Sequence, residues 1–142
     1  MFLFGAGFAI AAAVTETGMA EEIASHLIVF SDMPMILFLL IIAAMITFTT
    51  EITSNTALIS IMLPILYKVA EQTGIDATLI MMVATICASY AFMLPIATPP
   101  NAIAMSSGVV SVKTMASYGI VFNILGILLI VTVARSFWIH LL

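Results

Sequence analysis

Residues 94–102 read LPIATPPNA, and residues 49–56 read TTEITSNT; each stretch interrupts a long apolar part of the chain. The first stretch holds three prolines, which are Pro95, Pro99 and Pro100. A proline inside a helix has no N–H to donate and leaves the carbonyl four residues earlier unpaired. The carbonyls concerned are those of Ala91, Pro95 and Ile96. The proline pattern therefore predicts a helix that is interrupted within 94–102.

The composition of the chain indicates that this interrupted helix lies in a membrane protein. Of the 142 residues, 64% are hydrophobic and only 7% are charged, and the mean hydropathy is +1.33. Soluble domains carry about 25% charged residues, because their surface meets water. The chain is therefore predicted to be an integral membrane protein of the cell membrane that crosses the bilayer several times. A net charge of −4 with no basic cluster argues against a nucleic-acid partner.

Apolar runs separated by polar residues predict an all-α layout. In residues 16–32, acidic residues and apolar residues at helical spacing suit a short helix in the membrane interface. The opening residues resemble the middle of a hydrophobic segment, so we expect the C-terminal piece of a longer protein. The expected parts are a transmembrane helix end (1–15), the interfacial helix (16–32), a re-entrant hairpin (33–70), a discontinuous helix (77–110) and a final transmembrane helix (114–139).

Short apolar runs favour the hairpin. Crossing about 30 Å of hydrocarbon takes about 20 helical residues. The run at 57–67 is shorter than that and contains Pro64. Two short arms around a polar turn therefore predict a re-entrant hairpin, and the alternative is two complete spans joined by a polar loop.

The two interruptions have the chemistry of an ion and anion site. If the first arm is helical, Thr50 and Ser54 lie one turn apart, and Ser54 or Asn55 can cap the helix that follows. Thr98 followed by Pro99 is a typical start of a second half-helix. Hydroxyl and carbonyl oxygens suit sodium, and a helix N-terminus suits an anion. No lysine or arginine lies near either motif, so co-bound cations would balance the charge of the anion.

Two polar residues receive weaker predictions. Glu51 is either a solvated cap of the hairpin, which we favour, or a group that tunes the cation site. Asn123 lies outside both motifs and is expected to matter little for transport. No nucleophile–base or metal-binding pattern is present in the sequence, so it predicts neither an enzyme nor a cofactor.

Two longer stretches resemble a known family. TEITSNTALISIMLPIL, followed by ASYAFMLPIATPPNAIAMSSG, is similar to the second repeat of the divalent anion/sodium symporters, which include di- and tricarboxylate transporters. The resemblance implies one half of an inverted-repeat fold, in which dimers move their transport domains by an elevator mechanism. It implies sodium-coupled symport of a di- or tricarboxylate, with sodium as the coupling ion and no cofactor.

The resemblance also implies roles for individual residues. The hairpin tip would be Ser54, Asn55 and Thr56. The sodium ligands would be Thr50, Ser54, Asn55, Ala97 and Thr98, and the substrate contacts would be Asn55, Thr56 and Pro99. A first repeat with its own Ser-Asn-Thr tip is absent, so we expect a fragment of a longer protein. The alternatives are a sodium-independent carboxylate exchanger of the same fold and a membrane assembly subunit that transports nothing.

Overall fold

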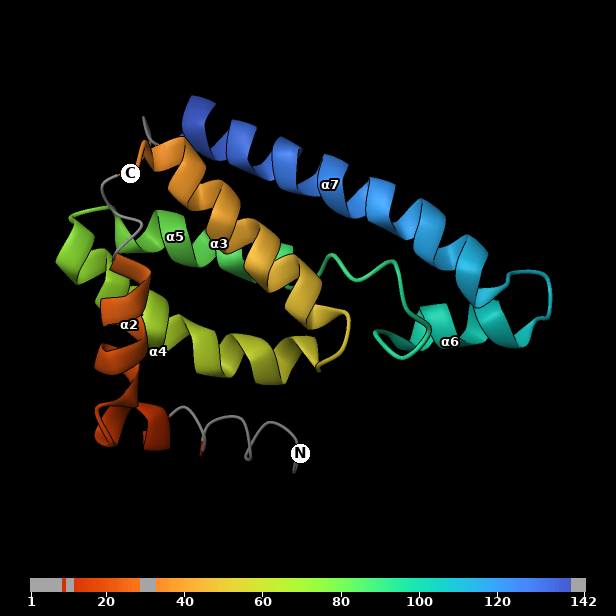
Figure 1. Ribbon diagram of the computed structural model, residues 1–142, viewed down its shortest axis with the longest axis horizontal. Coiled ribbons are helices and arrows are strands. Elements are labelled where there is room, and N and C mark those ends of the chain that lie inside the picture. Colours follow the sequence, from red (N-terminus) through yellow and green to blue (C-terminus); the bar gives the residue numbers. More distant parts are fainter. Residues whose placement is uncertain (1–8, 10–11, 29–32, 139–142) are drawn as a thin grey trace.

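The computed structural model describes residues 9, 12–28 and 33–138 (Figure 1). Every regular element among these residues is a helix, which confirms the predicted all-α class. The labelled helices are α2 (Met19–Ile28), α3 (Met35–Thr50), α4 (Asn55–Thr73), α5 (Ala77–Cys87), α6 (Pro99–Ser106) and α7 (Val112–Ser136). Most of the predicted segment 1–15, and the end of the one at 114–139, lie outside the described residues.

Local signals fix several helix ends. Asp76 accepts a hydrogen bond from the backbone N–H of Leu79 at 2.9 Å and so caps α5. Ser111 caps α7 in the same way, at 3.1 Å. Helix α4 ends at Gly74, whose φ of +72° is a left-handed conformation that glycine adopts without strain. These short-range contacts set the turns between the packed helices.

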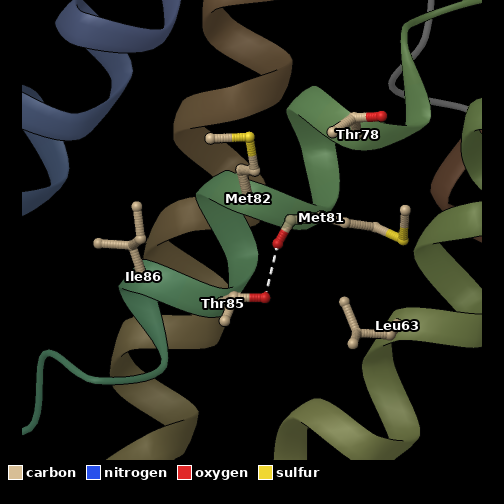
Figure 2. A pocket seen from close by; sticks show the side chains of 6 residues that line it. All are labelled: Leu63, Thr78, Met81, Met82, Thr85 and Ile86. Atoms are coloured by element: carbon tan, nitrogen blue, oxygen red, sulfur yellow. Dashed lines mark hydrogen bonds between the residues drawn. The ribbon is translucent and has the colours of Figure 1, made fainter.

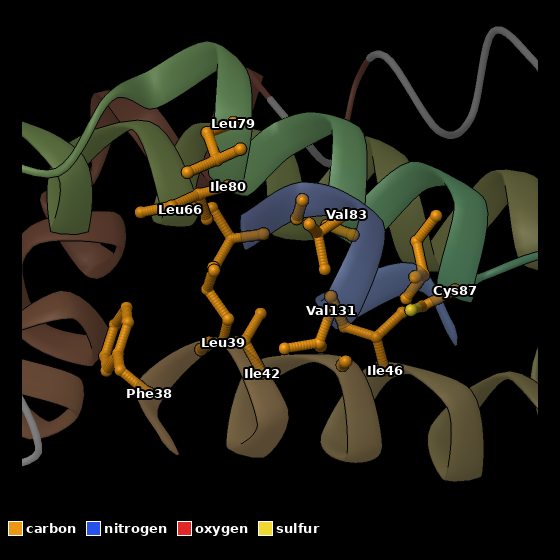
Figure 3. Packing of buried hydrophobic residues seen from close by; sticks show 14 of the residues in the cluster. Phe38, Leu39, Ile42, Ile46, Leu66, Leu79, Ile80, Val83, Cys87 and Val131 are labelled. Atoms are coloured by element: carbon orange, nitrogen blue, oxygen red, sulfur yellow. The ribbon is translucent and has the colours of Figure 1, made fainter. Parts of the chain in front are cut away.

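The helices pack around one main apolar core (Figure 3). Helix α3 is apolar on nearly every face and contacts α4, α5 and α7, while α4 also contacts α2 and α5. The buried side chains that Figure 3 labels are Phe38, Leu39, Ile42, Ile46, Leu66, Leu79, Ile80, Val83, Cys87 and Val131. Burying such side chains on all sides holds α5 between the two arms α3 and α4.

The polar interruptions lie at one end of this bundle. Figure 1 shows the turn between α3 and α4 beside the chain that leaves α5, with α6 farther out. We call residues 51–56 the hairpin tip and residues 88–98 the unwound segment. None of the described residues of α6 is buried, so α6 stands apart from the core.

Helices α3 and α7 follow the predicted apolar runs, whereas α4 is longer than its run at 57–67. Helix α7 has 25 residues and is the one described helix long and apolar enough to cross a bilayer. Helices α3, with 16 residues, and α5, with 11, are apolar but shorter. Helix α4 has 19 residues and contains Pro64. It continues past the apolar run at 57–67 into polar, helix-forming residues.

Candidate functional site

Thr50 joins the hairpin to the unwound segment. Its hydroxyl lies 2.6 Å from Asn55 Oδ1 and 2.8 Å from the carbonyl oxygen of Ala88, and the side chain is fully buried. Helix α3 ends at Thr50, so Ser54 does not continue its periodicity and is exposed. The prediction that Thr50 and Ser54 share a face was therefore wrong. Ser54 occupies the cap position of α4 without a side-chain cap bond.

Glu51 is the residue whose structure differs most from its prediction. Its side chain is 3% exposed, so it is no solvated cap. Oε1 accepts hydrogen bonds from the backbone N–H groups of Phe92 at 2.9 Å and Met93 at 3.0 Å. Oε2 accepts from Met93 at 3.1 Å and from Leu94 N–H at 3.0 Å. Three consecutive N–H groups, which no helix uses, thus balance a buried carboxylate.

A fourth donor to Glu51 comes from α7. Asn123 is fully buried, and its Nδ2 donates to Oε1 of Glu51 at 2.7 Å. We call Glu51, the N–H groups of residues 92–94 and the Asn123 amide the Glu51 network. The sequence placed Asn123 outside both motifs, whereas the structure places its side chain in this network. The available signal was a polar residue inside a membrane-length helix, which is costly unless it is paired.

Two glycines of α7 allow the unwound segment to approach closely. A Cβ at Gly119 would lie 2.5 Å from the carbonyl oxygen of Phe92 and 2.6 Å from Met93 Cα. A Cβ at Gly126 would lie 2.7 Å from the ring of Tyr90. Residues 119, 123 and 126 follow helical spacing and therefore share one face. This face of α7 receives the unwound segment.

The break in the helix begins earlier than the prolines predict. Helix α5 ends at Cys87, and the chain is not helical from residue 88 to 98, so the predicted start at residue 94 was wrong. The physical reason is tertiary, since Glu51 takes the N–H groups of residues 92–94. The predicted cap at the far end is confirmed, because Thr98 caps α6 and Pro99 opens it.

Asn101 organises the carbonyl side of the same segment. Its Nδ2 donates to the carbonyl oxygens of Ala91 at 2.8 Å and Leu94 at 3.0 Å. The proline rule predicted an unpaired carbonyl at Ala91, but this carbonyl accepts a hydrogen bond from Asn101. All three asparagines of the chain, at positions 55, 101 and 123, thus belong to the region around the hairpin tip and the unwound segment.

Two hollows lie near these elements. One, of about 480 Å³, is lined by residues of the unwound segment and α6, namely Pro95, Ile96, Thr98, Pro99, Ala102 and Met105. The other, of about 360 Å³, lies between α4 and α5 and is almost entirely apolar (Figure 2). In this second hollow the hydroxyl of Thr85 already donates to the carbonyl of Met81 at 2.7 Å. The first hollow is also lined mainly by apolar atoms, but two of the predicted site residues, Thr98 and Pro99, line it.

Comparison with known proteins connects this geometry to a family. The family model described as "Sodium:sulfate symporter transmembrane region" matches residues 1–142. The chain belongs to this symporter family. Na(+)/dicarboxylate cotransporter 3 of Rattus norvegicus is 40% identical over 138 residues, which cover 97% of this chain and 23% of the relative. The Na(+)/citrate cotransporter of the same species is 40% identical over 127 residues, 89% of this chain and 22% of the relative.

A bacterial relative is equally similar. A sodium-dependent dicarboxylate transporter of Staphylococcus saprophyticus is 39% identical over 133 residues, which cover 94% of this chain and 26% of the relative. The resemblance seen in the motifs is thereby confirmed, and the family consists of membrane transporters. The symporter-family chain spans about a quarter of the length of the curated relatives it matches.

The structure brings some of the predicted site residues together and leaves others apart. Thr50 and Asn55 are in direct contact, whereas Thr56 is half-buried beside them in the first turn of α4. Ala97 and Thr98 lie at the end of the unwound segment, next to the hollow described above. Among the described residues, no hydrogen bond joins these last two to the hairpin tip; the tip reaches the segment through residues 92–94 instead.

Proposed function

We propose that the full-length protein is a secondary transporter that carries a di- or tricarboxylate together with sodium. The observation that carries this proposal is the contact of the end of α3 and the hairpin tip with the unwound segment, made by Thr50 and Glu51. Broken helices of this kind bind ions and substrates in transporters, because their backbone groups are not used by a helix. The relatives named above are cotransporters of dicarboxylates and citrate, which supports an anionic substrate of this class.

The proposed sodium ligands are Thr50, Ser54, Asn55, Ala97 and Thr98. Hydroxyl, amide and carbonyl oxygens are hard donors and match a hard cation. The hydroxyl of Thr50 has one hydrogen but lies within 2.8 Å of two acceptors, Asn55 Oδ1 and the Ala88 carbonyl oxygen. One of these two oxygens can therefore bind a cation while the other keeps the hydrogen bond of the hydroxyl. Bringing Ala97 and Thr98 to the tip then requires the ion itself as the bridge.

The proposed substrate contacts are Asn55, Thr56 and Pro99. Helix α4 begins at Asn55 and α6 begins at Pro99, so both N-termini present a partial positive charge. The chain has three lysines and arginines in total, and none of their side chains forms a hydrogen bond with the described tip or unwound segment. A carboxylate would therefore depend on sodium for most of its charge balance, which explains coupling physically.

The wider architecture belongs to the same proposal. We place residues 33–70 as a re-entrant hairpin and residues 77–110 as a discontinuous helix in a multi-pass protein of the cell membrane. The hairpin and the broken helix would move as part of a transport domain in an elevator-type homodimer. Single cysteines at residues 53–56 should be labelled by a membrane-impermeant thiol reagent from the side that also labels residue 74. Labelling of 53–56 only from the opposite side would exclude the re-entrant hairpin.

The direct test of function is uptake by the reconstituted full-length protein. Proteoliposomes with an inward sodium gradient should accumulate succinate or citrate, and replacing sodium with choline should abolish accumulation. Exchange of internal for external carboxylate at an undiminished rate without sodium would show an exchanger instead. No movement of any tested carboxylate under either condition would contradict transport.

A further inference from the structure

We propose that Glu51 is a positioning residue, whose buried carboxylate holds the unwound segment in the conformation that binds sodium. This inference rests on the proposed function, because it concerns the geometry of the same site. In this proposal Glu51 does not itself contact the ion. The Glu51 network defined above is the whole of its structural basis.

The hydrogen bonds of the carboxylate leave it no capacity for a cation. A carboxylate has two oxygens with about four lone-pair positions. Glu51 uses them in five contacts of 2.7–3.1 Å with four donors. All of these donors direct N–H groups, and therefore partial positive charge, at the two oxygens. A sodium ion placed there would be repelled by the donors, so Glu51 acts on the site indirectly.

The network connects three parts of the chain that are distant in sequence. Glu51 follows the last residue of α3, its backbone donors lie 41–43 residues later, and Asn123 lies 72 residues later in α7. Thr50, the neighbour of Glu51, contacts both Asn55 and the carbonyl of Ala88. Fixing residue 51 against residues 92–94 therefore also fixes the Thr50 hydroxyl and the Asn55 amide oxygen, two of the groups proposed for sodium.

In the middle of the unwound segment, at residues 92–94, Glu51 accepts the hydrogen bonds of the N–H groups, whereas N–H groups nearer its two ends pair with backbone carbonyls. Helix α5 ends at Cys87 and α6 starts at Pro99, so the N–H groups at 92–94 have no helical partners. Without the carboxylate they would lose their partner in a partly buried place, and the backbone would shift to satisfy them. The hydrogen bond from Thr50 to the Ala88 carbonyl would then lose the support of the neighbouring Glu51 bonds.

The experiment compares Glu51→Gln and Glu51→Asp with a matched control in the full-length protein. Glutamine replaces one accepting oxygen with a donor that faces other donors, and aspartate keeps the charge but is one methylene shorter. Glu22→Gln is the control, because Glu22 is an exposed acid on α2, away from the network. One readout is the half-saturating sodium concentration for uptake. The other is hydrogen exchange of the amides at 92–94 in detergent.

The proposal predicts the same result for both Glu51 variants. Losing charge-assisted bonds to the unwound segment should raise the half-saturating sodium concentration roughly 10-fold or more and speed exchange at 92–94 by a similar factor. A merely structural role would lower the amount of folded protein and the maximal rate without moving the sodium dependence. Glu51→Asp with wild-type sodium dependence would overturn positioning in favour of charge alone, and unchanged exchange in both variants would also overturn it.

A milder variant decides the matter if the Glu51 variants fail to fold. Asn123→Ala removes one of four donors and should move both readouts in the same direction, by roughly 3-fold or more. Faster exchange with unchanged sodium dependence would reduce the network to a structural role and overturn the proposal. Absence of sodium-driven uptake in the wild type would instead contradict the proposed function, and hydrogen exchange would still report on the network.

Discussion

Gly119 offers a sharp test of how α7 receives the unwound segment. A Cβ at this position would lie 2.5 Å from the carbonyl oxygen of Phe92, whereas ordinary contact starts at 3.4 Å. Gly119→Ala therefore requires a displacement of about 0.9 Å between two backbones. The Phe92 N–H lies 2.9 Å from Glu51, so a shift of this size is enough to break that bond. Overpacking of this kind costs about 1–3 kcal/mol.

Gly126→Ala is the matched control in the same helix. Both substitutions gain about 1 kcal/mol of helix propensity relative to glycine. The three atoms nearest to a new Cβ at Gly126 all belong to the ring of Tyr90, the first at 2.7 Å, and this half-buried side chain can turn aside. Any difference between the two variants therefore reports the contact of α7 with backbone rather than the change of residue type.

The assay is thermal unfolding of the purified full-length protein, together with hydrogen exchange across residues 88–98. Gly119→Ala should unfold at a lower temperature than the wild type and exchange faster at residues 92–94. Gly126→Ala should stay close to the wild type in both measurements. If Gly119→Ala were as stable as Gly126→Ala, with protected amides at 92–94, the close approach described here would be wrong.

Other variants test the remaining contacts. Asn55→Ala removes an amide shared by the proposed sodium and substrate sites. Losing a buried hydrogen bond costs about 1–3 kcal/mol and should raise the half-saturation constants for sodium and for substrate roughly 5- to 150-fold in uptake assays. Gln72→Ala removes an exposed amide and should change neither constant. Asn101→Leu releases two carbonyls of the unwound segment and should raise the half-saturating sodium concentration roughly 5-fold or more, measured by sodium titration of uptake. Lys68→Gln breaks exposed ion pairs, at 3.7 Å to Glu21 on α2 and 3.0 Å to an acid on its own helix, and should leave the unfolding temperature nearly unchanged.

Local patterns in the sequence were sufficient for much of this fold. The apolar runs predicted helices, the length of α7 was readable from one uninterrupted stretch, and Thr98 before Pro99 predicted a helix start. Each of these signals acts within a few residues, through capping, propensity or burial of one face. They therefore survive in the tertiary structure.

The contacts that assemble the site could not be predicted in this way. Whether Glu51 is solvated or buried depends on donors more than 40 residues away, which no local pattern contains. The end of α5 at Cys87 was missed for the same reason, since residues 88–93 read ASYAFM and are compatible with a helix. The N–H groups of Phe92 and Met93 do not continue the helix because a buried carboxylate binds them. Gly119 was missed because its role depends on a backbone that approaches from another segment.

The central claim is that the hairpin tip and the unwound segment together bind sodium and substrate. It is tested most directly by single cysteines at Ser54 and Thr98 in a cysteine-free full-length protein that carries Cys87→Ala. Sodium with succinate or citrate should slow labelling by an impermeant thiol reagent at both positions, and potassium with the same anion should not. Protection at only one of the two positions, or equal protection with potassium, would contradict the claim.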